Sequence, residues 1–307
     1  MEKNRVIGSI VMLVAALIWG AAFVAQSVGM ESIGPFTFTG IRISLGALAL
    51  LIVCLIKDGL GSIKRSLQGK KPFFTKRELF YGSMMGLMFF IASNLQQYAL
   101  LYTTAGKSAF ITTLYIVFVP IAGLFMKKKV QPFVWIGVAG AFVGLYFLSV
   151  SPEETGLNFG DVLTFLCSLF FTAQIILIEK SGLETDGVKL SLVQFIVCGA
   201  LSVAMMFLFE TPKMDGIISA AIPLLYAGVL SGGVAYTLQI IAQRKLDTTV
   251  ASLLMSMESV FAVLTAWLLI QEAMTRREIF GCVIMFAAII WVQIADGLFL
   301  KKKKKEE

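Results

Sequence analysis

The feature that most constrains the fold of this chain is a series of ten long apolar segments. A helix that crosses a bilayer needs about 20 mostly apolar residues, and each segment is close to that length. The ten segments span residues 6–28, 36–56, 79–101, 104–126, 133–150, 159–178, 190–209, 217–241, 250–270 and 279–295. With 58% hydrophobic and only 15% charged residues, the chain has more apolar surface than a soluble fold buries. The sequence therefore predicts an all-α integral membrane protein with ten transmembrane helices.

The basic residues between the segments predict the orientation of the spans. If the N-terminus is cytoplasmic, 21 of the 26 Lys and Arg residues fall in cytoplasmic segments, four fall on the other side, and Arg42 lies inside the second span. Lys and Arg gather on the cytoplasmic side of membrane proteins, and leaving out one span would spoil this split. We therefore expect a multi-pass protein of the inner (plasma) membrane with both termini in the cytoplasm. The run of lysines at 301–305 is expected to rest on anionic membrane lipid.

The second five segments look like a degenerate copy of the first five. A shift of 144 residues places Thr104 on Thr248 and Ser108 on Ser252, and the segment lengths follow the same order. The predicted division is therefore a first repeat over 1–150 and a second repeat over 151–307 that carries the basic tail. Because each half has an odd number of spans, the second half must enter the membrane from the opposite side. Such inverted repeats, with a cavity between the halves, are typical of secondary transporters.

Several function classes are disfavoured by the residues that the chain lacks. There is no histidine, which removes Ser-His and Cys-His nucleophilic pairs and histidine metal sites. The four cysteines are scattered through apolar segments, where small packing residues are expected rather than metal ligands. The string GKS at 106–108 lacks the first glycine of a phosphate-binding loop, since Leu101 stands there. We therefore expect no enzyme activity, cofactor, metal or nucleic-acid partner. A non-enzymatic membrane scaffold or assembly factor remains the alternative to a transporter.

Three stretches of the sequence are similar to one known family. The runs ALIWGAAFVAQ (16–26), QQYALLYTTAGKSAFITTLYIVFVPIAGLFM (96–126) and SMESVFAVLTAWLLIQE (256–272) resemble, in this order and spacing, EamA-type proteins of the drug/metabolite transporter superfamily. Two departures are Ser259, where the family usually has Pro, and Gln271, where it usually has Gly. The resemblance implies ten helices in two inverted EamA repeats. It also implies export or exchange of small polar metabolites such as amino acids.

Two charged residues inside the predicted spans are candidates for a site, because ionisable groups are costly at that depth. Glu258 lies about 12 Å from the start of the ninth span, near the middle of the membrane. It either takes up a coupling proton or a substrate amine, or it satisfies a neighbouring donor as a structural carboxylate. Arg42 could hold a substrate carboxylate, although extending to the outer surface or pairing with Glu31 is the favoured interpretation.

Uncharged polar residues recur at helical spacing on the third, fourth, eighth and ninth spans. Taken singly, each could form an interhelical hydrogen bond, but the four stripes together predict one central cavity that binds a small-molecule substrate. Aromatic and amide side chains on the first and sixth spans add to it. The predicted substrate-binding residues are Trp19, Gln26, Asn94, Gln97, Tyr98, Ser108, Thr112, Tyr115, Gln174, Tyr236, Gln239, Ser256 and Glu258.

Overall fold

A computed structural model describes residues 2–59, 72–103, 105–149, 158–269 and 274–306, and its regular elements within these ranges are all helices. The first half contains α1 (Glu2–Met30), α2 (Pro35–Asp58), α4 (Lys76–Ala99), α5 (Ala105–Thr112), α6 (Tyr115–Phe125) and α7 (Pro132–Ser149). The second half contains α8 (Phe159–Ser181), α9 (Gly187–Phe209), α10 (Met214–Ser219), α11 (Ala221–Leu225), the π-helix η1 (Tyr226–Ala235), α12 (Tyr236–Gln243), α13 (Thr248–Met255), α14 (Met257–Leu269) and α15 (Arg276–Glu306).

Eight stretches of the described chain are long and apolar enough to cross a membrane. Three of these combine consecutive helices: α5 with α6, α11 with η1 and α12, and α13 with α14. A shorter apolar helix lies at Pro132–Leu148, and α4 has 24 residues but is not among the eight. Its last turns carry the amides of Asn94, Gln96 and Gln97, which lower its hydropathy. The chain is therefore a multi-pass membrane protein, and the number of ten spans remains a prediction.

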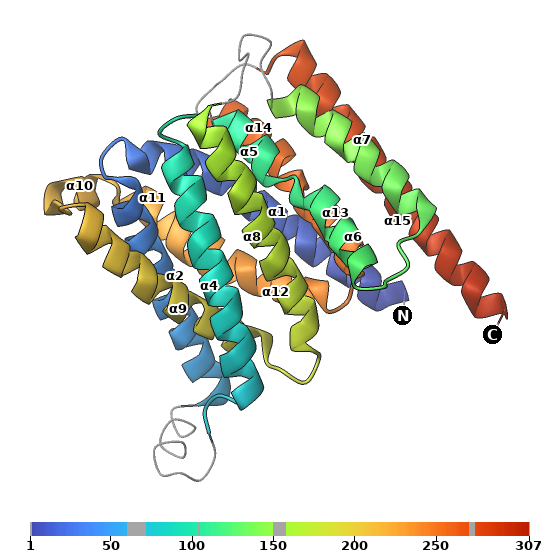
Figure 1. Ribbon diagram of the computed structural model, residues 1–307, viewed down its shortest axis with the longest axis horizontal. Helices are drawn as coiled ribbons and strands as arrows, with labels where there is room; N and C mark the ends of the chain where they lie inside the picture. Colours follow the sequence, from blue (N-terminus) through green and yellow to red (C-terminus); the bar gives the residue numbers. More distant parts are fainter. Residues whose placement is uncertain (1, 60–71, 104, 150–157, 270–273, 307) are drawn as a thin grey trace.

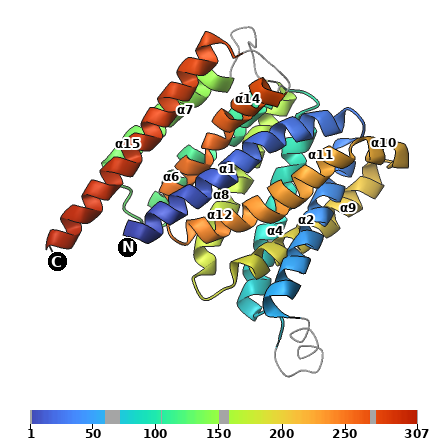
Figure 2. The ribbon, with the colours of Figure 1, turned by 180° about the vertical axis from the view of Figure 1, so that it is seen from behind.

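The helices form one bundle in which the two halves interleave. Helix α2 packs along α9, and α4 packs along both α8 and α9. Helices α7 and α15 lie side by side at one edge of the bundle, as both views show (Figures 1 and 2). Helix α1 runs between these groups and contacts α12, α14 and η1. The first repeat is thus packed against the second along most of its helices.

Two glycines allow the helices around the centre to approach closely. A Cβ atom on Gly20 of α1 would lie 2.5 Å from the Cβ atom of Phe261, so α1 meets α14 there. A Cβ atom on Gly228 of η1 would lie 2.7 Å from the backbone oxygen of Arg42, so η1 meets α2 there. These distances are shorter than side-chain packing tolerates. Close packing at Gly20 therefore places the adjacent Trp19 of α1 near the centre of the bundle. Close packing at Gly228 does the same for Arg42 of α2.

The fourth and ninth segments of the sequence are each split in two. Helix α5 ends at Thr112 and α6 begins at Tyr115, while α13 ends at Met255 and α14 begins at Met257. Short side chains accompany both interruptions and bond to the preceding turn. Thr113 Oγ1 donates to the carbonyl of Ala109 at 2.6 Å, and Ser256 Oγ donates to the carbonyl of Leu253 at 2.7 Å. Such bonds compete with the regular helical ladder.

Candidate functional site

A small cavity lies among helices of both halves, near the middle of the bundle. Its volume is about 50 Å³, which is room for a few water molecules. It is lined by Trp19, Ala22, Phe23, Gln26, Arg42, Gln96, Thr112, Tyr115, Phe171, Gln174, Ser231, Tyr236, Gln239, Met255 and Glu258. We call this the central cavity. A solute as large as an amino acid could enter it only if the surrounding helices moved apart.

Glu258 lies in the first turn of α14, directly after the break that follows α13. Its side chain is 8% exposed, and Tyr115 donates its hydroxyl proton to Oε1 at 2.8 Å. Tyr115 begins α6, directly after the break in the other half. The two split helices therefore bring a tyrosine and a carboxyl group together at the cavity. Burial disfavours the charged form of such a carboxyl group unless water or a partner compensates.

Arg42 lines the same cavity from α2, and its side chain is buried. The structure differs here from the favoured sequence interpretation. Glu31 is exposed beyond the end of α1, and no described acidic residue forms an ion pair with Arg42. The side chain of Arg42 is 4% exposed, and α2 packs against α9 and η1, so the guanidinium does not extend to the outer surface. The cavity is therefore lined by a positively charged guanidinium from Arg42 as well as by the acidic side chain of Glu258.

Amide groups surround these two charged residues. Gln96 donates to the hydroxyl of Thr112 at 3.1 Å, and Gln239 donates to Gln174 Oε1 at 3.5 Å. Gln174 in turn donates to Gln194 Oε1 at 3.4 Å. Among these groups, Gln239 Oε1 and Gln194 Nε2 are buried without a hydrogen-bond partner. Buried polar atoms are nearly always satisfied in folded proteins, so water or a bound polar solute is the expected partner.

An aromatic cluster forms one wall of the cavity. The rings of Trp19 and Tyr236 lie edge to face with centroids 4.9 Å apart, and Phe89 lies 4.5 Å from Tyr236. The indole Nε1 of Trp19 is buried without a partner. Because an indole N–H usually finds an acceptor when it is buried, this donor is also available to a solute or to water.

The structure brings together eight of the residues predicted to bind a substrate. They come from both halves of the chain and all line the central cavity: Trp19, Gln26, Thr112, Tyr115, Gln174, Tyr236, Gln239 and Glu258. Sequence reasoning had not included Gln96 or Ser231 among the site residues. Gln96 is next to the predicted Gln97 on α4, and Ser231 lies on the π-helix, a form that is frequent at functional sites.

Five predicted residues lie away from the cavity in this structure. Asn94 donates to Ser202 Oγ at 3.0 Å, and the buried Gln97 contacts the sulfur of Met30. Tyr98 bonds the hydroxyl of Tyr102 at 3.3 Å. Of the two serines, Ser108 lies 3.4 Å from the hydroxyl of Thr164, and Ser256 bonds its own helix. Their place in a substrate site therefore stays a prediction.

Charged residues pair at both ends of the bundle. At one end, Lys107 Nζ lies 2.7 Å from Asp161 Oδ2, and both side chains are almost fully buried. Asp161 also forms a capping box with Asn158 at the start of α8, where the helix dipole favours an acidic side chain. At the other end, Lys189 Nζ lies 2.6 Å from Asp58 Oδ2.

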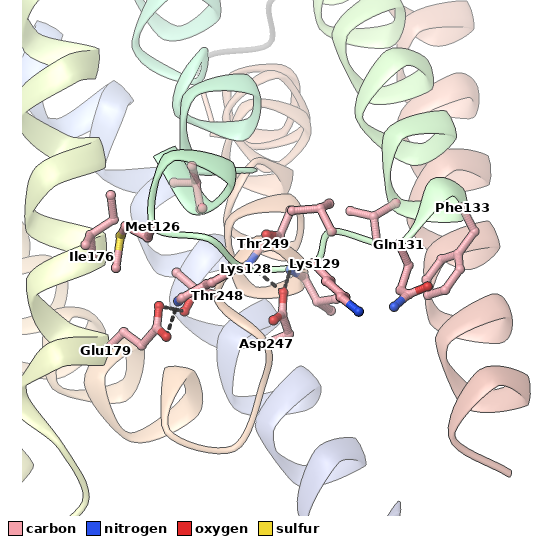
Figure 3. A pocket seen from close by; sticks show the side chains of 15 residues that line it. Met126, Lys128, Lys129, Gln131, Phe133, Ile176, Glu179, Asp247, Thr248 and Thr249 are labelled. Carbon is pink, nitrogen blue, oxygen red and sulfur yellow. Dashed lines mark hydrogen bonds and ion pairs between the residues drawn. The ribbon is translucent and has the colours of Figure 1, made fainter. Parts of the chain in front are cut away.

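The larger pockets lie outside the centre. One has a volume of about 240 Å³ and lies between the α6–α7 connection, α8 and the start of α13 (Figure 3). In it, Glu179 accepts from Lys128 and from the hydroxyl of Thr248, while Asp247 caps α13 (Figure 3). These acidic groups are already used by neighbours on the chain. The central cavity is much smaller, but Trp19, Arg42 and Gln239 in its lining each have a buried polar atom without a hydrogen-bond partner. We therefore take it as the candidate site.

Comparison with known proteins agrees with this architecture. A protein of Archaeoglobus fulgidus named as an uncharacterized transporter is 29% identical over 297 residues, covering 95% of this chain and 87% of that protein. A Bacillus subtilis protein named as the uncharacterized transporter YoaV is 22% identical over 279 residues, covering 89% of this chain and 92% of that protein. A crystal structure of a protein that is 14% identical shares the fold, with a TM-score of 0.74 over 94% of this chain and 96% of that one.

The model of the EamA-like transporter family matches the chain twice, over residues 6–150 and 158–294. Together with the transporter names of the relatives, this points to membrane transport rather than to catalysis. The resemblance predicted from the three sequence stretches is confirmed. The chain belongs to the EamA-like transporter family.

Proposed function

We propose that this protein is a secondary active transporter of the inner (plasma) membrane that exports or exchanges small polar metabolites, such as amino acids, by alternating access. In this proposal, residues 1–150 and 151–307 are two inverted repeats of five spans each. Both termini are cytoplasmic, as the 21-to-4 distribution of basic residues favours. The substrate binds in the central cavity between the repeats.

The observation that carries the proposal is the meeting of two split helices at a buried polar cavity. Discontinuous helices from two related halves are the usual frame of a transporter site. Here the breaks lie beside Tyr115 and Glu258, which belong to different halves and share a hydrogen bond. An inert bundle gains no stability from burying unpaired amide, indole and guanidinium groups together. The small volume of the cavity fits a closed state from which either side could open.

Glu258 is the residue that we propose to carry a coupling proton. A carboxyl group in this position is more stable when it is neutral or hydrated. Opening the cavity to water on one side therefore favours release of its proton there, and closure favours its retention. The same carboxylate could also receive the amine of a substrate. In either role, Glu258 acts from the first turn of α14.

The test is a comparison of cells that contain the protein with cells that lack it. Small polar metabolites are measured inside and outside both strains by mass spectrometry. A transporter changes the ratio of external to internal concentration for at least one metabolite. A membrane scaffold or assembly factor leaves these ratios unchanged while altering the amount or assembly of another protein, and that result would contradict the proposal.

A further inference from the structure

Arg42 has no partner among the described residues, although its side chain is only 4% exposed. Its Nε atom is buried and forms no hydrogen bond. No carboxylate of the described chain forms an ion pair with its guanidinium. A guanidinium keeps its charge in proteins, and a buried charge without a partner is strongly destabilising. The molecule therefore holds a positive group at the centre of the bundle for a reason other than its own packing.

The other charged group of the cavity does not fulfil this need. Among the described residues that line the central cavity, Arg42 is the one cation and Glu258 the one acidic residue. Glu258 accepts the hydroxyl of Tyr115 and forms no ion pair with Arg42. Both groups therefore face the same space without neutralising each other. A solute that enters this space meets one fixed positive charge.

We infer that Arg42 binds the carboxylate of the transported solute. This inference rests on the proposed transport function and adds the recognition of an anionic group to it. A guanidinium presents parallel N–H donors that match the two oxygens of a carboxylate. A singly charged carboxylate balances one arginine, whereas a dianionic phosphate ester would leave negative charge next to Glu258. An amino group on the same solute could then face Glu258.

The backbone of α2 is closely packed where Arg42 is attached. The backbone oxygen of Arg42 lies against Gly228 of η1, where a Cβ atom would approach it to 2.7 Å. The neighbouring Ile43 is fully buried against the core. The backbone of α2 is thus held from two sides at this point. The point from which the Arg42 side chain extends is therefore fixed, which limits where its guanidinium can meet the anionic group of a solute.

The test compares solutes that differ only in this group, on the unmodified protein. Purified wild-type protein in detergent is titrated with the common L-amino acids, with their C-terminal amides, and with acetate and lactate. Binding is measured by the increase in Tm and by calorimetry. We expect at least one of the carboxylates to bind, and its amide to bind on the order of 10- to 100-fold more weakly, because a charge-assisted hydrogen bond is lost.

Substitutions of Arg42 then assign the selectivity to this side chain. In Arg42→Gln, the preference for the acid over the amide should disappear. In Arg42→Lys, the preference should persist with weaker binding, because lysine keeps the positive charge but lacks the parallel N–H donors of a guanidinium. Glu31→Gln, which removes an exposed charge near the same end of the bundle, should leave the preference unchanged.

In the binding experiments, two kinds of result would overturn the inference, one from the wild-type protein and one from the variant. One is that amides bind as well as their acids, or that no carboxylate of the panel binds. The other is that Arg42→Gln retains the wild-type preference. Because the solute comparison needs no variant, an unstable Arg42→Gln leaves the test decisive. Metabolite ratios that change in cells only for solutes without an anionic group would overturn the role of Arg42 while leaving the transport function supported.

Discussion

The hydroxyl oxygens of Thr113 and Ser259 lie 3.2 Å apart. Thr113 occupies the break between α5 and α6, and Ser259 lies in the first turn of α14, directly after the break that follows α13. The contact therefore joins the two halves where each half has a discontinuous helix. A single neutral hydrogen bond contributes about 0.5–1.5 kcal/mol, so the halves can separate here at little cost.

A disulfide in place of this hydrogen bond should stop transport. In a background without the four native cysteines, Thr113→Cys combined with Ser259→Cys should cross-link on oxidation, since the side chains already meet. If the two halves move apart during the cycle, solute flux falls to background on oxidation and returns on reduction. Each single variant serves as the control. Undiminished flux with a complete cross-link would show that this contact does not open.

The cavity predicts a pattern of accessibility to aqueous thiol reagents. Single cysteines at Thr112 and Gln239, which line the cavity, should react with small charged reagents added to membranes. Cysteines at Leu124 and Leu268 should not react, because these apolar side chains are exposed on the surface of the bundle, where lipid lies. Labelling is read by a mass or fluorescence shift. Equal labelling of both sets would remove the case for a hydrated cavity.

Asp186 should contribute stability that disappears in acid. Burial alone would raise the pKa of Asp186. The Lys57 ammonium and the backbone N–H groups of Lys189 and Val188 lower it by more than burial raises it, so the net pKa is below the ordinary value. A carboxyl group whose pKa is lowered by folding stabilises the folded protein at pH values above its unfolded-state pKa of about 4. This stability is lost as the pH falls through the folded-state pKa.

Asp186→Asn isolates this electrostatic contribution, since asparagine also caps a helix. At pH 7 the Tm of the variant in detergent should be lower than that of the wild type, corresponding to about 0.2–1 kcal/mol for a partly exposed pair. The difference should shrink as the pH is lowered to about 3. Asp247→Asn is the matched control, because Asp247 caps α13 and forms no ion pair with a described residue. A difference in Tm that grows with acidification would have the wrong sign.

Glu258→Gln should uncouple transport from a proton gradient. The amide keeps the shape of the side chain and can still accept from Tyr115, but it cannot titrate. Flux driven by a pH gradient should fall to background, whereas solute binding should survive. Tyr115→Phe is the companion variant, since it removes the hydrogen bond and leaves the carboxyl group able to carry a proton. If Glu258→Gln transports with the pH dependence of the wild type, Glu258 is structural.

The sequence predicted the helical membrane fold because hydropathy and loop charge are local properties. Eight of the residues that it predicted to bind a substrate line the central cavity, and helical spacing accounts for pairs on one helix such as Tyr236 and Gln239. Whether they bind a substrate stays a prediction. The sequence could not separate Gln96 from Gln97, because adjacent residues differ by about 100° around a helix, and packing decides which one faces inward. The π-helix changes the register before α12, and a sequence pattern that assumes 3.6 residues per turn does not contain this shift.

The environment of Arg42 was also beyond the sequence. Its position near the end of an apolar segment fits a side chain that extends to the surface. Only the packing of α2 against α9 and η1, from the other half of the chain, turns it toward the cavity. For the same reason, the predicted neighbour Glu31 could not be excluded as a partner until the end of α1 was placed.

The central claim, that a solute crosses the membrane through the cavity between the halves, is tested most directly by flux into sealed liposomes containing purified protein. The solute is one identified by the metabolite comparison. Wild-type protein should give saturable flux above that of empty liposomes. Ser231→Leu, which fills the 50 Å³ cavity, should lower the flux at least tenfold. Leu230→Phe, at an exposed position of the same π-helix, should not. Equal flux in all three proteins, or none in the wild type, would contradict the account.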